Sequence, residues 1–314
     1  AVSSGTAALH LALLASGIKE SDEVITTSYS FIASATPILF CGAVPVFVDI
    51  DPKTYNINPD QIAKAITNKT KAIIAVHLFG YPADMQEIMR IANKYGLVVI
   101  EDCAQALGAC INNQKVGTFG DAACFSFYPS KAITTGEGGL IATNETKIAK
   151  KVKLLRDHGQ IAKHKHVLLG YNLRMTEIAA AIGSCQLEKL ELRNKKRIKN
   201  AKYYYAQLNG ISNIKLPYVA PNVKHVFHMY ACHTNKKFRN KIVSYLQRNG
   251  IDARAGYLKP IYQQPLFKKY KYRKLPCKMA EEIANEIFLL PVHPSLSKRE
   301  LDYVVAKLKE LEKS

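Results

Sequence analysis

Several residues whose side chains could take part in catalysis or ligand binding lie in the first half of the chain, at or just after the ends of apolar runs. Asp102 ends the apolar run LVVIED, Ser126 follows the apolar run ACF, and Lys131 comes shortly after Ser126. Near the start, Gly5 and Thr6 open the apolar helical stretch TAALHLALLASG. A lysine amine can form a Schiff base with a carbonyl compound, so these residues predict a site for amine–carbonyl chemistry.

Pyridoxal phosphate requires groups of these kinds. Its phosphate needs backbone N–H donors at a helix N-terminus, which Gly5 and Thr6 can supply because glycine permits close approach and threonine adds a hydroxyl. Its pyridine nitrogen needs a carboxylate, for which Asp102 is suitably placed at the end of a buried strand. Its aldehyde needs an amine, and Lys131 lies in a short polar segment before the glycine-rich run GEGG.

Each of these features also has an ordinary structural explanation. The SGT sequence before a helix can be a simple N-cap, and an Asp at a strand end can be a turn residue. A loop lysine can simply be solvated, and GEGG can be a turn. A site is favoured because the features occur together, in order, at the strand ends of one predicted sheet.

The elements that would position these residues alternate between strand and helix. Helices are predicted at 6–17, 31–41, 60–66 and 84–95, and strands at 23–27, 44–49, 71–77, 97–102, 123–127 and 138–143. Continuous apolar strands separated by helices are typical of a largely parallel sheet covered on both faces, so the fold class is α/β. Ligands of such sheets bind beyond the carboxyl ends of the strands, where Asp102 and Ser126 are expected.

The pattern changes after Arg174. One long helix, or two helices with a bend, is predicted from Met175 to Leu208. A strand near 226–232 and helices at 236–249, 278–288 and 297–312 follow it. We therefore predict a large α/β domain at residues 1–200 and a smaller C-terminal α+β domain at residues 201–314.

The chain of 314 residues carries a formal net charge of +19. Such a charge favours anionic partners such as nucleic acid, an anionic membrane or a phosphorylated ligand, but a solvated lysine-rich surface is the simpler explanation and is preferred. No nucleic-acid recognition motif supports the first partner, and the basic residues are spread over several elements. No apolar run reaches the ~20 residues of a membrane span, so neither nucleic acid nor membrane is expected as a partner.

Cysteine and histidine spacing argues against a disulfide framework and against a metal site. The seven cysteines are an odd number and include no CxxC pair. The pairs His164 with His166 and His225 with His228 lack supporting Cys or carboxylate spacing, so no metal is predicted. Unpaired cysteines fit a reducing compartment, and the expected location is the cytoplasm.

Several segments resemble the DegT-type (StrS-like) sugar-nucleotide aminotransferase family, and the match covers nearly the whole chain. They are SSGTAALHLAL (3–13), VHLFGYPADM (76–85), IEDCAQALGA (100–109), FSFYPSKAITTGEGG (125–139), LLRDHG (154–159), GYNLRMTEIAAAIGSCQL (170–187), FHMYACH (227–233) and FLLPVHPSLS (288–297). The resemblance implies a pyridoxal-phosphate enzyme of fold type I. It also implies a homodimer whose active sites are shared between subunits.

The resemblance implies a role for individual residues by position. Lys131 matches the lysine that forms the Schiff base, and Asp102 matches the carboxylate on the pyridine nitrogen. Gln105 matches the residue near the ring hydroxyl of the cofactor. The remaining matches are Thr6 and Ser126 as phosphate ligands, Phe31 as the aromatic ring stacked on the cofactor, and Asn172 as a phosphate contact donated by the other subunit.

The implied activity is transfer of an amino group, from L-glutamate by family habit, onto a nucleotide-linked keto-sugar. Arg174, Tyr257 and Lys259 are candidates for contacts with this substrate, as is the basic loop 162–166. Members with His in place of the lysine perform dehydration, so Lys131 favours transamination. A pyridoxal-phosphate sugar dehydratase or lyase, and a non-catalytic regulatory protein of the same fold, remain alternatives.

Two departures from the family pattern are visible. Members usually carry further residues before SSGT, including a first helix that helps to shape the site, so an N-terminal segment is expected to be missing. Whether the chain is active without that segment is left open. Many members also have His where Leu107 stands, a position that tolerates Leu.

Overall fold

A largely parallel seven-stranded sheet forms the centre of the computed structural model, which describes residues 1–313. Its strands lie in the order β15-β2-β1-β3-β4-β7-β8, and β8 is antiparallel to β7 while the other neighbours are parallel. The bounds are β1 Glu23–Thr27, β2 Val44–Val48, β3 Thr70–Val76, β4 Val98–Asp102, β7 Ala122–Ser126, β8 Gly139–Ala142 and β15 Arg273–Lys274. The predicted α/β class is therefore confirmed.

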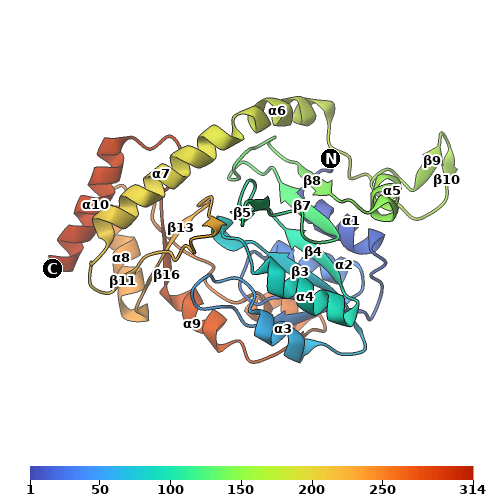
Figure 1. The fold of residues 1–314 in the computed structure, drawn as a ribbon, viewed down its shortest axis with the longest axis horizontal. Helices are drawn as coiled ribbons and strands as arrows, with labels where there is room; N and C mark the ends of the chain where they lie inside the picture. Colours follow the sequence, from blue (N-terminus) through green and yellow to red (C-terminus); the bar gives the residue numbers. More distant parts are fainter. Residues whose placement is uncertain (314) are drawn as a thin grey trace.

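Helices cover both faces of this sheet, because successive strand residues point to opposite sides (Figure 1). Ile74 belongs to the core shared with α1, whereas its neighbour Ile73 belongs to the core shared with α4. The first face carries α1 Gly5–Ala15, α2 Thr36–Phe40, α5 Thr146–Leu155 and α9 Lys278–Glu286, and the second carries α3 Pro59–Ala65 and α4 Met85–Tyr95. This two-sided burial explains why the strands are apolar throughout.

A smaller antiparallel sheet lies in the C-terminal part of the chain. Its order is β11-β13-β16-β14, with β11 Ile214–Lys215, β13 Tyr230–Thr234, β14 Arg254–Ala255 and β16 Ile287–Leu290. Three helices share its core: α7 Leu190–Leu208, α8 Lys236–Arg248 and α10 Lys298–Lys313. In Figure 1, α6 Glu177–Glu188 continues into α7, and together they connect the two sheets along one edge of the molecule.

Short elements complete the fold. The remaining strands are β5 Cys110–Ile111, β6 Gln114–Lys115 and β12 Val223–Lys224, which form a three-stranded sheet, and the hairpin β9 Gln160–Ala162 with β10 Lys165–His166. The 3₁₀ turns are η1 Ile32–Ser34, η2 Leu78–Gly80, η3 Ile261–Gln263 and η4 Pro265–Lys268. No helix within residues 1–313 is both long enough and apolar enough to span a bilayer.

The C-terminal part of the chain contributes to both sheets. β15 pairs with β2 at the edge of the large sheet, and Arg273 donates from Nε and Nη2 to the two carboxylate oxygens of Glu23 at 3.1 and 2.9 Å. Tyr262 and Phe267 lie in the core of the large sheet. The division at residue 200 stays a prediction, and the chain beyond it crosses between the two cores.

Two predicted elements differ from the structure. The helix at 31–41 is instead an extended Phe31, the turn η1 and the short helix α2, which has Pro37 in its first turn because proline lacks the N–H that a helix interior requires. The strand near 226–232 begins only at Tyr230, since the backbone before it bonds to the turn η2: Val226 N–H donates to Gly80 and Met229 N–H donates to Phe79.

Candidate active site

The N-terminus of α1 meets the carboxyl end of β7 and forms a cradle of backbone amides. A Cβ atom on Gly5 would lie 2.7 Å from the Cβ of Ser126, so the close approach requires glycine. Ser4 caps the helix through Oγ, which accepts from Ala7 N–H at 3.0 Å. The backbone N–H groups of Gly5 and Thr6 have no acceptor among residues 1–313, because the first turn of a helix leaves its N–H groups without helical partners. Such N–H groups can bind an anion.

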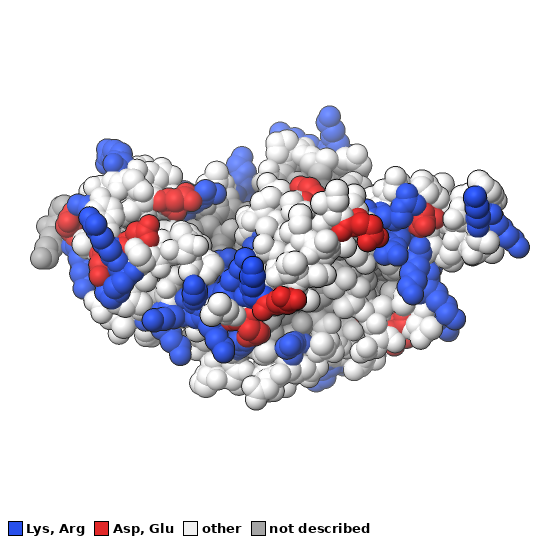
Figure 2. All heavy atoms as spheres, turned by 90° about the horizontal axis from the view of Figure 1, so that it is seen from above, with Lys and Arg blue, Asp and Glu red and all other residues white. Residues whose placement is uncertain are grey.

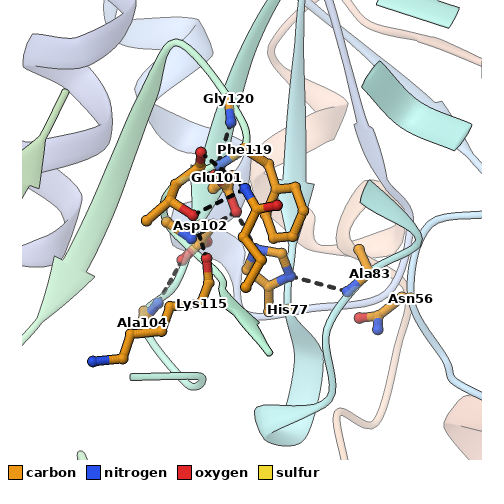
Figure 3. Close-up of polar contacts among 12 residues, drawn as sticks. Asn56, His77, Ala83, Glu101, Asp102, Ala104, Lys115, Phe119 and Gly120 are labelled. Atoms are coloured by element: carbon orange, nitrogen blue, oxygen red, sulfur yellow. Dashed lines mark hydrogen bonds and ion pairs between the residues drawn. The ribbon is translucent and has the colours of Figure 1, made fainter. Parts of the chain in front are cut away.

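Asp102 ends β4 as a nearly buried carboxylate that two donors hold in place. The side chain is 6% exposed. Its Oδ2 accepts from the Ser34 hydroxyl at 2.8 Å. Its Oδ1 accepts from the Ala104 N–H at 3.2 Å (Figure 3). Ser34 also shares a hydrogen bond of 3.0 Å with Ser30. A negative charge is thus fixed at the strand end.

Lys131 lies in the loop that follows β7. Its backbone N–H donates to the Tyr128 carbonyl at 2.9 Å, which fixes the loop as a turn. Burial lowers the pKa of the Lys131 amine, and the attraction of the nearby Asp102 carboxylate offsets only part of this effect. A lowered pKa increases the fraction of neutral amine, which is the nucleophilic and basic form.

Gln105 connects this edge of the large sheet to the C-terminal part of the chain. Its Oε1 accepts from Phe79 N–H at 2.8 Å, and its Nε2 donates to the Tyr257 hydroxyl at 3.0 Å. The Tyr257 ring stacks on Phe79 with centroids 6.4 Å apart. Burial raises the pKa of Tyr257 to about 12, so its hydroxyl keeps its proton near neutral pH.

The predicted aromatic residue is also near this cluster. Phe31 is 56% exposed and directly precedes the turn η1, whose last residue, Ser34, holds Asp102. A large exposed aromatic side chain at a strand end offers a free ring face for stacking. The structure thus brings seven of the predicted residues to one edge of the sheet: Gly5, Thr6, Phe31, Asp102, Gln105, Ser126 and Lys131, with Tyr257 beside them.

Three other predicted residues form no hydrogen bond or ion pair with this cluster in the part of the chain that the structure describes. Asn172 is exposed and forms an isolated bridge with Asp157, and the side chain of Arg174 pairs with Asp157. Lys259 is exposed and forms no ion pair with any residue in the range 1–313. Their roles stay predictions.

A hydrogen-bond network that the sequence did not predict lies next to Asp102 on β4. Glu101 is fully buried and accepts from the backbone N–H groups of Gly117, Phe119 and Gly120 at 2.7, 2.8 and 2.9 Å (Figure 3). Its Oε2 also lies 3.1 Å from His77 Nε2. Burial alone would raise the pKa of Glu101, but hydrogen bonds from His77 and the backbone outweigh it and lower the pKa.

This network is complete without a metal ion. His77, Glu101 and Cys103 lie close enough together to resemble a ligand set. However, Ala83 N–H donates to His77 Nδ1 at 2.9 Å, so Nε2 carries the proton that points at Glu101. Both ring nitrogens and both carboxylate oxygens are already engaged. A carboxylate inside the apolar run LVVIED was the available sequence signal for this network.

The fold and the site together define a class. A mostly parallel sheet with a lysine after one strand and a buried carboxylate after its neighbour is the arrangement of a fold type I transferase. The chain belongs to the DegT/DnrJ/EryC1/StrS aminotransferase family, whose family model matches residues 1–309. The predicted family and the aminotransferase class are thus confirmed.

Named relatives and a solved structure are similar over nearly the whole chain. "Pleiotropic regulatory protein" of Geobacillus stearothermophilus is 42% identical over 98% of this chain and 82% of its own length. "UDP-N-acetyl-3-dehydro-alpha-D-glucosamine 3-aminotransferase" of Acidithiobacillus ferrooxidans is 42% identical over 95% of this chain and 80% of its own. The crystal structure of NtdA from Bacillus subtilis with bound cofactor PMP has a TM-score of 0.92 and 35% identity, covering 100% of this chain and 73% of that one.

Proposed function

We propose that this protein is a pyridoxal-phosphate-dependent aminotransferase that moves an amino group from L-glutamate to a nucleotide-linked keto-sugar. The observation that supports this proposal most directly is the position of four residues at one edge of one sheet. They are Lys131, Asp102 with its fixed carboxylate, and Gly5 and Thr6 with their free amides. The relative named as a UDP-sugar 3-aminotransferase supports the substrate class.

Several residues of the site suit this cofactor. The glycine-only approach of Gly5 to Ser126 leaves room for a phosphate at the unpaired helix amides. The buried carboxylate of Asp102 suits a protonated pyridine nitrogen, and Phe31 offers a ring face. PMP, the group bound in the NtdA structure, is the aminated form of pyridoxal phosphate.

When bound, the cofactor supplies an aldehyde that accepts the amino group and a ring that takes up electron density. Asp102 holds a proton on the ring nitrogen by charge, and Ser34 and Ala104 keep its carboxylate oriented. Lys131 Nζ, with its lowered pKa, would take the proton from the amino-bearing carbon of the donor as general base and deliver it to the former aldehyde carbon of the cofactor as general acid. Gly5, Thr6 and Ser126 would bind the phosphate.

The sugar nucleotide would meet residues outside this core. Tyr257 is the candidate best supported by contacts, because its hydroxyl lies 3.0 Å from Gln105 Nε2 at the inner edge of the site. Arg174 and Lys259 are exposed cations that suit a diphosphate. In Figure 2, Lys and Arg side chains form several separate groups with Asp and Glu between them, which does not resemble a single track for a nucleic acid.

The active form is proposed to be a homodimer with shared sites. Helix α6, with the sequence EIAAAIGSCQLE, buries only Ala179, while Ile178 is 78% exposed and Leu187 is 55% exposed. An apolar helix left open to solvent is typical of a surface that another chain covers. The exposed segment around Asn172 precedes this helix, which suits the predicted contribution of Asn172 to the partner's site.

The proposed location is the cytoplasm. All seven cysteines fall within the described residues and are free thiols. Cysteine-containing proteins without disulfides are usual in reducing compartments.

The test is transfer of ¹⁵N from labelled L-glutamate. The cofactor-loaded protein would be incubated with UDP-, GDP- and dTDP-linked 3-keto and 4-keto sugars, and the products weighed by mass spectrometry. The proposal predicts one amino-sugar nucleotide that carries the ¹⁵N label. A product that has lost oxygen without gaining ¹⁵N would indicate the dehydratase, and no product from any sugar would favour a regulatory protein.

A further inference from the structure

His228 lies beside the candidate site with both ring nitrogens unused. The N–H of its neighbour Met229 donates to the Phe79 carbonyl at 3.4 Å, and the Phe79 N–H in turn donates to Gln105 Oε1 at 2.8 Å. A Cβ on Gly80 would lie 2.9 Å from His228 N, so the two segments are in direct contact. Neither Nδ1 nor Nε2 of His228, both buried, has a hydrogen-bond partner within residues 1–313.

Arg197 lies at the middle of the buried stripe of α7. Three residues before it, Asn194 donates from Nδ2 to the Leu107 carbonyl at 3.0 Å, next to the Gln105 loop. Further along the helix, Tyr204 packs on Tyr230 of β13, with ring centroids 5.2 Å apart. Arg197 therefore lies between the loop of Gln105 and the start of β13, which is where His228 is also found.

Within residues 1–313, the guanidinium of Arg197 has no acidic partner. The residue is 8% exposed, its Nε is buried without a partner, and no hydrogen bond or ion pair joins the side chain to any residue of the described chain. Burial lowers the pKa of the Arg197 guanidinium, and the nearby like charge of Arg193 on the same helix lowers it further. Burying a cation without a partner lowers the stability of the fold, so an anion bound at this position would be stabilising.

The imidazole of His228 complements such an anion. Burial lowers the pKa of His228 well below its ordinary value, and the nearby cations Lys131 and Arg197 lower it further. The ring is therefore neutral and can donate one hydrogen bond without needing a charge partner of its own. Both cations act on this ring, so His228 lies near Lys131 and near Arg197.

We propose that Arg197 and His228 form a subsite beside Lys131 that binds a carboxylate of the amino donor. This inference rests on the proposed aminotransferase function and assigns two further residues to it. The planar fork of a guanidinium matches a carboxylate or a phosphate. The carboxylate is favoured because Arg197 is nearly buried, which suits a small dicarboxylic acid, whereas a nucleoside diphosphate needs an open route for its base and ribose.

The test compares binding of two non-reacting probes to the cofactor-loaded protein by isothermal titration calorimetry. Glutarate represents the donor without its amino group, and UDP represents the sugar nucleotide. For Arg197→Met, the subsite predicts a loss of glutarate affinity of roughly 10- to 100-fold, the effect of losing charge-assisted hydrogen bonds, with UDP affinity unchanged. His228→Phe is expected to weaken glutarate binding by a smaller factor. Lys196→Met removes a charge from the solvent face of the same helix and is expected to change neither.

A second variant keeps the test valid if Arg197→Met is misfolded. Arg197→Lys retains the charge without the fork, and we expect intermediate glutarate affinity together with a normal circular dichroism spectrum. Unchanged glutarate affinity in both Arg197 variants, or a loss confined to UDP, would overturn the subsite. A wild type that binds glutarate but transfers no nitrogen from glutamate would instead contradict the proposed function alone.

Discussion

At the scale of single residues, the site depends on charged side chains whose orientation is fixed by hydrogen bonds. The carboxylate of Asp102 can act on a ring nitrogen only if it keeps its orientation, and the Ser34 hydroxyl provides a hydrogen bond of 2.8 Å for this purpose. Preorganised charge of this kind is effective because it needs no rearrangement during the reaction.

Replacing these two residues should therefore lower turnover to different extents. Asp102→Asn removes the charge and is expected to reduce kcat by at least about 100-fold. Ser34→Ala leaves the charge but frees its orientation, and about a tenfold loss is expected. Steady-state kinetics of ¹⁵N transfer measure both, with Ser244→Ala on the exposed side of α8 as the control. Equal losses for Ser34→Ala and Asp102→Asn would contradict the division of roles.

The sequence predicted some of these residues and missed others for a physical reason. Asp102 and Ser126 could be placed because the carboxyl ends of adjacent parallel strands meet at one edge of a sheet. Ser34 could not be placed, since its partner is 68 residues away and no spacing encodes the contact. Arg197 lies in the basic run KKRIK, where its burial is invisible without knowing which face of the helix packs inward.

At the scale of elements, the network of Glu101 fixes the end of β4. One buried carboxylate accepts from three backbone N–H groups of the loop 117–120 and from His77, which follows β3. It thereby ties together two neighbouring strands and the segment that enters β7, directly behind Asp102. Sequence patterns give the strands, but they do not show which polar residue closes the loop between them.

Replacing Glu101 should lower the stability and change its response to acid. Glu101→Gln turns an acceptor-only group into one that presents an NH₂ to backbone donors, and a loss of about 2 to 3 kcal/mol in the free energy of unfolding is expected. The pKa of Glu101 is lowered in the folded protein, so its stabilisation is complete above the unfolded value of about 4.3 and disappears as the pH falls through the folded pKa.

Urea unfolding between neutral pH and pH 3 measures both effects. The wild type should lose more stability than Glu101→Gln as the pH falls below about 4.3, because the variant has no carboxylate to protonate at this position. Glu282→Gln, which affects an exposed carboxylate on α9, is the control. Parallel acid curves for wild type and Glu101→Gln would contradict the assignment.

At the scale of the whole molecule, helix α6 leaves an apolar face uncovered. Ile178 and Ile182, one helical turn apart on the same face, are exposed on a helix that consists largely of small residues. The two sheets and their cores could be expected from the apolar periodicity. The exposed apolar surface of α6 could not, because the sequence does not show that nothing in residues 1–313 covers it. A second copy of the chain is the proposed cover.

A charge placed on this face should separate the subunits. Ile182→Glu would bury an unpaired carboxylate in the proposed interface, so the variant is expected to sediment as a monomer in analytical ultracentrifugation, with activity reduced because each site lacks its partner. Phe238→Glu is a matched control, since Phe238 is 41% exposed on α8 and Ile182 is 43% exposed on α6. A wild type that sediments as a monomer, or an Ile182→Glu variant that remains a dimer, would contradict the proposal.

Lys131 is proposed to be the lysine that joins covalently to pyridoxal phosphate. Borohydride reduction of the cofactor-loaded protein, followed by peptide mass spectrometry, locates this bond directly. We expect one phosphopyridoxyl group, on the peptide that contains Lys131, and its loss when L-glutamate is added before reduction. A modification on another lysine, or none in a protein that binds the cofactor, would contradict it.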